Sequence, residues 1–250
     1  MQSPTKGSWN PGDPWPKAIL FDMDDTILSF GVSAEEVWRS MSEEYAPRID
    51  GFAPDDLFTT LSDYAKWYWS DPERHRKGRL HPDVMLYIVT GALDSIGVKA
   101  LSVASEMAET YSAVRERSAR TSRGAIDVLR LLRSEGVRLA LVTNGNAERQ
   151  RRKVETHRLA PLFDYILIEG EFGLGKPDER VYLHALSQVG ATPDEAWMVG
   201  DNLEWEVAAP QRLGMVGIWV DATGSGLPRS SEVRPDRTIR AVPELLEQAS

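Results

Sequence analysis

The chain has 250 residues, 42% of them hydrophobic and 27% charged, which is the composition of an ordinary globular protein and not of a disordered one. Lys and Arg total 29 against 38 Asp and Glu, and the resulting net charge of −9 argues against a broad surface for nucleic acid or for an anionic membrane. The absence of cysteine excludes disulfide scaffolds, thiolate catalysis and cysteine-ligated zinc.

The N-terminal segment, residues 1–16, is polar and rich in Pro, Gly and Trp. It lacks the apolar stretch of a signal peptide, and no run in the sequence approaches the length of a membrane span. We therefore expect a cytoplasmic protein with an N-terminal tail, whose Trp9 and Trp15 pack back on the domain. The four histidines lack the paired spacing of zinc sites.

The first predicted strand runs directly into two carboxylates. Ala18 to Phe21 is an apolar run typical of a buried parallel strand, and Asp22 and Asp24 follow it. Ligands bind beyond the carboxyl ends of strands in open α/β sheets. One acid could attack as a nucleophile while the other moves protons, and both could gather a divalent cation. The structural alternative is an ordinary turn or helix cap, where acids are also common.

From residue 32 to residue 116 the pattern is helical, with no convincing strand. Ser33 can cap a first helix that carries Val37, Trp38 and Met41 at helical spacing. Further helices are predicted at 57–69, 84–96 and 101–114.

Strands and helices alternate over the rest of the chain. Helices are predicted at 123–134, 147–157, 179–189 and 203–213. Strands are predicted at 137–142, 165–168, 196–199 and 216–220, with an edge strand at 237–241 before a short helix from Pro243. Pro210 falls inside one predicted helix and should bend it, and residues 224–234 are predicted to form an exposed loop.

This alternation predicts an α/β fold with a Rossmann-like, doubly wound parallel sheet and helices on both faces. The helical block separates the first strand from the others, so the simplest arrangement is an insertion. The core would comprise residues 17–31 and 117–250, and the inserted all-α helical-bundle cap would comprise residues 32–116. Hinges between the two are expected near Gly31 and at 117–123.

Polar groups follow the other predicted strands as well. Thr143-Asn144-Gly145 follows one strand, Gly200-Asp201-Asn202 follows another with Glu206 beyond it, and a glycine-rich loop carries Lys176. Each has a structural alternative as a turn, a helix start or a solvated lysine. Because the carboxyl ends of parallel strands lie along one edge, we expect the groups to converge there.

Convergence would crowd several carboxylates, which is costly unless a cation joins them. Mg²⁺ fits such a site, because it prefers one or two carboxylates together with waters and a phosphate oxygen. The Thr143 hydroxyl and nearby backbone N–H groups could hold the remaining phosphate oxygens, and Lys176 could neutralise charge.

The ordered set of Asp22-Met23-Asp24-Asp25-Thr26, Thr143, Lys176 and Asp201 resembles the haloacid dehalogenase (HAD) superfamily of hydrolases with a helical C1-type cap. The resemblance spans residues 17–220. Thr143-Asn144-Gly145 followed by Gln150 and Lys153 is similar to the N-acylneuraminate-9-phosphate phosphatase and nucleotidase branch. The resemblance implies a Mg²⁺-dependent phosphatase that hydrolyses a small phosphorylated metabolite.

The resemblance also implies roles in catalysis. Asp22 would attack phosphorus and form an aspartyl-phosphate, and Asp24 would protonate the leaving alcohol and then activate water. Thr143, with Asn144 and Gly145, would bind the phosphate, and Lys176 would stabilise the charged groups.

For the metal, the resemblance implies Asp22, the backbone carbonyl of Asp24, and Asp201 as ligands. Glu206 stands where the family more often has aspartate. It is a further candidate metal ligand, which would bind the metal directly, act through a metal-bound water, or orient Lys176.

Other activities on the same fold are a 2-haloacid dehalogenase and a phosphomutase. Dehalogenase relatives usually lack an aspartate at the position of Asp24, because displacing a halide needs no acid for the leaving group. A phosphomutase would use the same two carboxylates and stays open. A non-enzymatic binding protein would predict a missing catalytic group, and none is missing.

Substrate specificity is expected from the helical insertion, where residues 67–79 combine aromatic and cationic side chains. Arg76 and Arg79 are candidates to bind a second anionic group of the substrate. The alternative is a solvated segment with Trp67 and Trp69 in the core of the cap. The expected partner is thus a small phosphorylated metabolite, with no nucleic acid and no membrane, for a monomer or a homodimer.

Overall fold

The structure, a computed structural model, describes residues 14–49 and 51–247. The chain divides into two compact units, an α/β unit of residues 1–29 and 120–250 and a helical unit of residues 30–119. Most of the expected N-terminal tail, including Trp9, lies outside the described residues. Trp15 packs edge-on against Trp197 with the ring centroids 5.9 Å apart, as expected for a tail residue that covers the domain.

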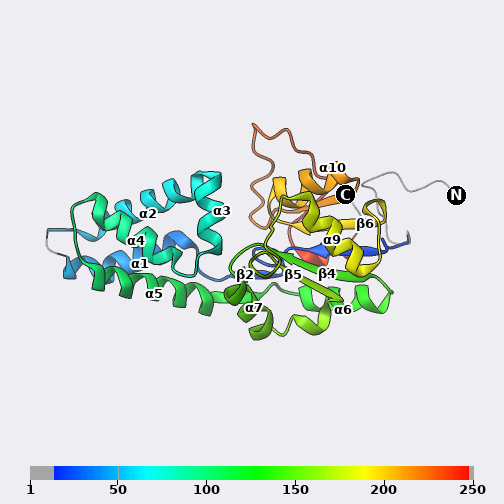
Figure 1. Ribbon diagram of the computed structural model, residues 1–250, viewed down its shortest axis with the longest axis horizontal. Helices are drawn as coiled ribbons and strands as arrows, with labels where there is room; N and C mark the ends of the chain where they lie inside the picture. Colours follow the sequence, from blue (N-terminus) through cyan, green and yellow to red (C-terminus); the bar gives the residue numbers. More distant parts are fainter. Residues whose placement is uncertain (1–13, 50, 248–250) are drawn as a thin grey trace. The chain divides into compact units, whose positions relative to one another are not determined.

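In the described part of the α/β unit, six parallel strands form one sheet in the order β5-β4-β1-β6-β7-β8. Figure 1 labels β4, β5 and β6 of this sheet. The strands are β1 (Ala18–Phe21), β4 (Arg138–Thr143), β5 (Tyr165–Ile168), β6 (Ala196–Gly200), β7 (Val216–Val220) and β8 (Arg237–Ile239). Phe21, the last residue of β1, is in register with Leu141 of β4 and with Val199 of β6. The residues that follow these three strands therefore lie at one edge of the sheet.

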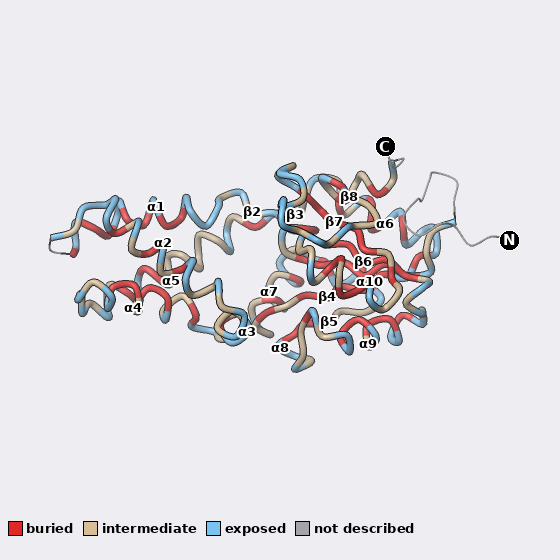
Figure 2. The backbone as a smooth tube through the Cα atoms, turned by 90° about the horizontal axis from the view of Figure 1, so that it is seen from above, coloured by how far each residue is buried: buried red, intermediate tan, exposed pale blue. Residues whose placement is uncertain are grey.

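The sheet is buried on both faces, as Figure 2 shows for its central strands. Ala18 and Leu20 of β1 point into one apolar cluster, and Ile19 and Phe21 point into the other. This alternation follows from the two-residue period of a strand. The continuous apolar runs of the sequence are thus explained by helices on both sides.

Two sets of helices cover these faces. One cluster is completed by α6 (Ala125–Ser134), α7 (Ala147–Thr156) and a terminal 3₁₀ helix (Val242–Leu246). The other is completed by α9 (Glu179–Val189) and α10 (Ala209–Leu213). The unit also contains α8 (Glu169–Phe172) and 3₁₀ turns at Ala160–Leu162 and Pro193–Glu195. The predicted doubly wound parallel sheet is confirmed.

The segment predicted as one bent helix over 203–213 has a different form. Leu203–Ala208 is a π-helical turn, and the α-helix α10 follows it. Pro210 has no N–H to donate to the carbonyl of Glu206, so the regular i to i−4 ladder cannot pass this point. The N–H of Ala209 bonds instead to the carbonyl of Glu204, which is the wider π spacing.

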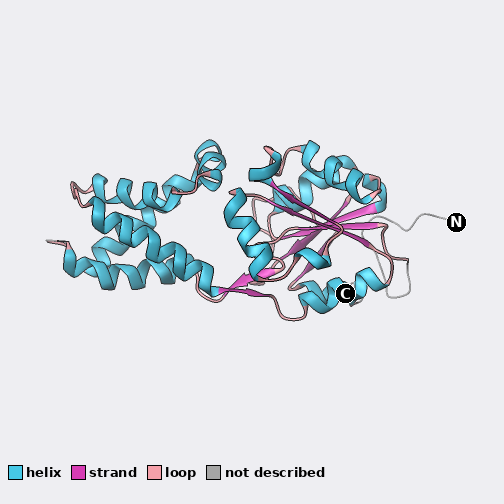
Figure 3. Cartoon of the chain, turned by 60° about the horizontal axis from the view of Figure 1, so that its bottom comes forward, coloured by secondary structure: helices cyan, strands magenta, loops and turns pink. Residues whose placement is uncertain are grey.

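The helical unit contains α1 (Ala34–Tyr45), α2 (Pro54–Ser70), α3 (Pro72–Leu80), α4 (Val84–Ser95) and α5 (Leu101–Ser118), with a 3₁₀ turn at Ala46–Arg48 (Figure 3). Ser33 caps α1 in a capping box with Glu36, as its position predicts. The apolar positions Val37, Trp38 and Met41 are buried in the core of the unit. Helix α3 is not apparent from periodicity, because a nearly apolar-free segment gives no hydrophobic stripe.

The two crossings between the units are short strands, β2 (Leu28–Phe30) and β3 (Ala119–Thr121), which pair in a small sheet of their own. Strands of three residues are too short for a period-2 signal, so the sequence does not predict them. The crossings fall close to the expected domain boundaries. None of the helices in the described ranges has the length and apolar character needed to span a membrane.

Candidate active site

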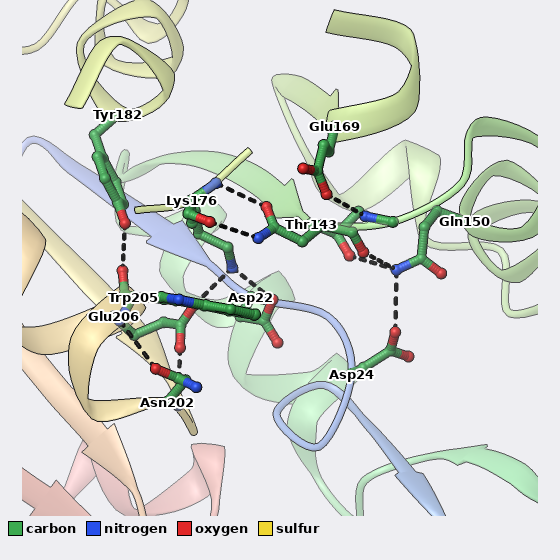
Figure 4. A network of polar contacts seen from close by, with 12 residues as sticks. Asp22, Asp24, Thr143, Gln150, Glu169, Lys176, Tyr182, Asn202, Trp205 and Glu206 are labelled. Atoms are coloured by element: carbon green, nitrogen blue, oxygen red, sulfur yellow. Dashed lines mark hydrogen bonds and ion pairs between the residues drawn. The ribbon is translucent and has the colours of Figure 1, made fainter. Parts of the chain in front are cut away.

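A buried lysine joins two carboxylates at the carboxyl edge of the sheet (Figure 4). The Lys176 Nζ donates to Asp22 Oδ1 at 2.6 Å and forms an ion pair with Glu206 Oε1 at 2.7 Å. The Lys176 side chain is 0% exposed and that of Glu206 is 1% exposed. Charges this deeply buried persist only when paired, so the three groups form one electrostatic unit.

Local backbone features bring Glu206 to this lysine. The π-helical turn starts at Asn202, whose side chain accepts from the N–H groups of Glu204 and Trp205. The Asn202 N–H donates to Glu206 Oε2 at 2.8 Å, and the hydroxyl of Tyr182 donates to the Trp205 carbonyl. Both carboxylate oxygens of Glu206 are therefore engaged within the protein.

Gly200, the last residue of β6, leaves room for Glu206. A methyl group at this position would lie 2.1 Å from Glu206 Cγ and 2.8 Å from Cδ. We expect Gly200→Ala to lower the free energy of unfolding by about 1–3 kcal/mol, because Glu206 must move away from Lys176. Gly31→Ala is the matched control, since its added carbon meets only the Ser118 carbonyl at 3.6 Å. Denaturant unfolding of both variants checks this, and equal stability of the two would contradict it.

The loop that carries Lys176 is fixed by Asn144. The Asn144 Nδ2 donates to the Lys176 carbonyl and its Oδ1 accepts from the Lys176 N–H, both at 2.8 Å. Glu169 Oε2 accepts from the N–H of Gly145, the next residue, at 2.9 Å. The backbone after β4 is therefore tied to the lysine loop on one side and to α8 on the other.

The side chain of Gln150 links Thr143 and Asn144 to Asp24. Its Nε2 donates to Thr143 Oγ1 and to the Asn144 carbonyl, each at 2.8 Å, and to Asp24 Oδ2 at 3.0 Å. Lys153, three residues along α7, donates to both oxygens of Asp24, at 2.8 and 2.6 Å. Figure 4 shows Gln150 between Thr143 and Asp24.

The site carries more negative charge than its lysine neutralises. Burial raises the pKa of Asp22, although Lys176 opposes this. Burial and the like charge of Asp22 raise the pKa of Asp201, and burial raises the pKa of Glu206 to about 7. Burial alone would lower the pKa of Lys176, but its two carboxylate partners raise it, so the lysine stays charged.

The arrangement fits a hard divalent cation held by Asp22 and Asp201. Within residues 14–49 and 51–247, no three acidic or histidine side chains form a metal cage by themselves. The carboxylates of Asp24 and Glu206 are turned to Lys153 and Lys176. Mg²⁺ needs only one or two carboxylates, with water and phosphate oxygens as further ligands. The negative charge of Asp22 raises the pKa of Asp201, and a cation bound between the two carboxylates would offset this repulsion.

Most of the predicted site residues thus converge in the α/β unit. The exceptions are Arg76 and Arg79, which lie on α3 of the helical unit, and their role in substrate binding stays a prediction. Arg74 of the same helix stacks on Trp67 with its Cζ 4.0 Å from the ring centroid. Trp67 is 51% exposed, so it does not belong to the core of the helical unit.

Sequence alone assigns no role to Gln150, Lys153 or Glu169. The available signal was the spacing of Gln150 and Lys153, which places both on one side of a helix that begins just after Thr143-Asn144-Gly145. Glu169 gives no such signal, because its contact with the Gly145 N–H depends on the pairing of β4 with β5.

Comparison with known proteins places this geometry in a family. The model of haloacid dehalogenase-like hydrolases matches residues 16–214. Glyceraldehyde 3-phosphate phosphatase of Methanopyrus kandleri is 28% identical over 92% of this chain and 96% of its own length. N-acylneuraminate-9-phosphatase of Rattus norvegicus is 25% identical over 92% of each chain. Phosphoserine phosphatase of Thermus thermophilus is 43% identical, but the match spans only 42% of its length and 43% of this chain.

Solved structures agree on the fold. A magnesium-bound HAD hydrolase of Bacillus subtilis superposes with a TM-score of 0.69 at 23% identity, over 92% of this chain and 97% of the other. A 2-haloacid dehalogenase of Pseudomonas syringae gives a TM-score of 0.62 at 23% identity, over 92% and 96%. With the family model covering most of its length, the chain belongs to the haloacid dehalogenase-like hydrolases.

Proposed function

We propose that this hydrolase is a Mg²⁺-dependent phosphatase that cleaves a small phosphorylated metabolite through an aspartyl-phosphate on Asp22. The main support for the proposal is that Asp22 and Asp24 lie at one edge of the sheet and are held by different partners. Asp22 is paired with the buried Lys176, while Asp24 is held by Lys153 and Gln150. Two acids in different surroundings suit the separate roles of nucleophile and proton carrier.

In the proposed first step, a carboxylate oxygen of Asp22 bonds to phosphorus as the bond to the leaving oxygen breaks. Asp24 gives its proton to that oxygen, and an alcohol leaves. In the second step Asp24 takes a proton from water, whose oxygen bonds to phosphorus as the bond to Asp22 breaks. Thr143 ends β4, which pairs with β1 in the sheet, and it would contribute its hydroxyl to the phosphate.

Lys176 holds Asp22 in place and offsets negative charge where it accumulates. Mg²⁺, bound by Asp22 and Asp201 with the Asp24 carbonyl, would offset the repulsion between the nucleophile and the phosphate and orient the transferring oxygens.

Asp24 favours the phosphatase over the dehalogenase. Halide departs without a proton, whereas an alkoxide leaving group needs one, and Asp24 stands two residues from the nucleophile to supply it. Relatives that match nearly the whole chain carry names of phosphatases, which supports the same reaction class. Their names differ in substrate, so we assign the class of phosphate monoesters and not a single compound.

The proposal is tested by phosphate release from 4-nitrophenyl phosphate and from a panel of phosphorylated metabolites. We expect turnover with Mg²⁺, loss of at least about a hundredfold after chelation with EDTA, and recovery when excess Mg²⁺ is added. Unchanged thermal unfolding in EDTA would show that the loss is chemical and not structural. Full activity in EDTA would refute the requirement for Mg²⁺. Release of halide from 2-haloacids without release of phosphate from any ester would refute the phosphatase activity.

A further inference from the structure

The side chain of Asp24 is held by a single helix. Lys153 of α7 donates to both of its oxygens at 2.8 and 2.6 Å, and Gln150 of the same helix donates to Oδ2 at 3.0 Å. Gln150 is buried, and the side chain of Lys153 is 20% exposed. An aspartate near the surface of a site would otherwise sample several rotamers, so these contacts fix where its carboxylate points.

Gln150 has more acceptors than hydrogens. Three oxygens lie within 3.0 Å of its Nε2, those of Thr143, Asn144 and Asp24, while an amide nitrogen carries two hydrogens. Asp24 can therefore release Gln150 and turn to a substrate oxygen while both N–H groups keep a partner. The Gln150 amide thus links the Thr143 hydroxyl, proposed to bind the phosphate, to the Asp24 carboxylate, proposed to protonate the leaving group.

We propose that Lys153 and Gln150 are positioning residues for the proton transfer by Asp24, an inference that rests on the proposed function. Both oxygens of Asp24 accept hydrogen bonds in the structure, which is the anionic state that Asp24 reaches when it has given its proton to the leaving oxygen. The ammonium of Lys153, already within hydrogen-bond distance, stabilises that charge as it forms. Until Asp24 turns to the leaving oxygen, Gln150 holds its carboxylate close to Thr143, and so close to the phosphate.

This role makes a prediction about leaving groups. Phenyl phosphate and 4-nitrophenyl phosphate have nearly the same shape, but the phenoxide is far more basic and depends more on protonation. We expect Lys153→Met to lower kcat/KM for phenyl phosphate by about tenfold or more, mainly in kcat, and for 4-nitrophenyl phosphate by less than about threefold. Lys153→Arg should restore most of the loss, because it keeps the cation.

Arg152→Met is the matched control. Arg152 neighbours Lys153 on α7, its side chain is 50% exposed and it pairs with Glu148 at 2.7 Å. This variant should leave both esters unaffected. In an Asp24→Asn background, Lys153→Met should have little further effect, because the group that it positions has gone.

The outcomes separate the two proposals. If Lys153→Met slows both esters by the same factor, or slows Asp24→Asn as much as the wild type, Lys153 does not act through Asp24 and the inference is overturned. The proposed function would survive that result. If the wild-type protein with Mg²⁺ releases phosphate from neither ester nor from the metabolite panel, the proposed function fails and the inference fails with it.

Discussion

Asp22→Asn is expected to abolish phosphate release while leaving the fold intact. The amide cannot form the aspartyl-phosphate, and Glu206, the other carboxylate paired with Lys176, is held by the Asn202 N–H. We expect kcat to fall by a factor on the order of 10⁶, comparable to the loss of a nucleophile in another covalent mechanism. Steady-state kinetics with 4-nitrophenyl phosphate and saturating Mg²⁺ measures this. Turnover at the wild-type rate would exclude Asp22 as the nucleophile.

The electrostatics of the site predict that Asp22→Asn is at least as stable as the wild type. Burial raises the pKa of Asp22, which means that folding disfavours its charged form relative to the unfolded chain. A neutral amide of the same shape removes that cost, and Lys176 keeps Glu206 as a partner. The melting temperature should therefore stay the same or rise, which is the pattern expected when a site gives up stability for activity.

Asp25→Asn is the control for the same chemical change nearby. Asp25 is exposed and has a left-handed backbone with a φ of 57°, which asparagine also tolerates. This variant should keep turnover within about threefold of the wild type, an effect typical of a surface substitution.

The sequence predicts the fold well where apolar runs and strand ends coincide. β5 and β7 have the predicted bounds, because an apolar run flanked by turn residues marks where a strand begins and ends. Helix α9 also has its predicted bounds, because Asp178 caps its start and Gly190, with a left-handed backbone, ends it. Helix α3 is not predicted, since its sequence Pro72–Leu80 is polar on every side and is held by the Asp71 cap. The π-helical turn is not predicted either, because a proline signals a break but not the hydrogen-bond spacing that replaces it.

For the site, the strand-end argument locates Asp22, Thr143 and Lys176 because topology alone brings strand ends together. It does not reveal which partner each side chain takes. Whether Glu206 faces a metal water or Lys176 depends on the turn after Asn202 and on the space left by Gly200. Neither the form of this turn nor the space at Gly200 can be predicted from the pattern of residues in the sequence.

Lys176→Met is expected to have the largest combined effect on stability and activity. It leaves the carboxylates of Asp22 and Glu206 buried without their cation, which typically costs about 3–5 kcal/mol of folding free energy. Activity should fall together with stability. Lys17→Met is the control, because its pair with Glu195 is exposed at 3.2 Å and is worth at most about 1 kcal/mol.

The pH dependence of the stability of Lys176→Met shows whether the loss of stability comes from the buried carboxylates. Without the lysine, the pKa values of Glu206 and Asp22, already raised by burial, rise further above those of the unfolded chain. A carboxyl whose folded pKa is raised contributes stability that is present below its unfolded pKa, near 4 for Asp and Glu. That contribution is lost as the pH rises through the folded pKa, about 7 for Glu206 even with the lysine present.

The difference in melting temperature between the wild type and Lys176→Met, measured in EDTA, should therefore widen from pH 5 to pH 8. The double variant Lys176→Met, Glu206→Gln removes one of the two stranded carboxylates and should recover part of the loss at pH 8. A lost packing contact would behave differently, because it would lower the melting temperature equally at both pH values and the double variant would recover nothing. That result would mean that the lysine serves the core as a space-filling side chain and not as the shared cation of Asp22 and Glu206.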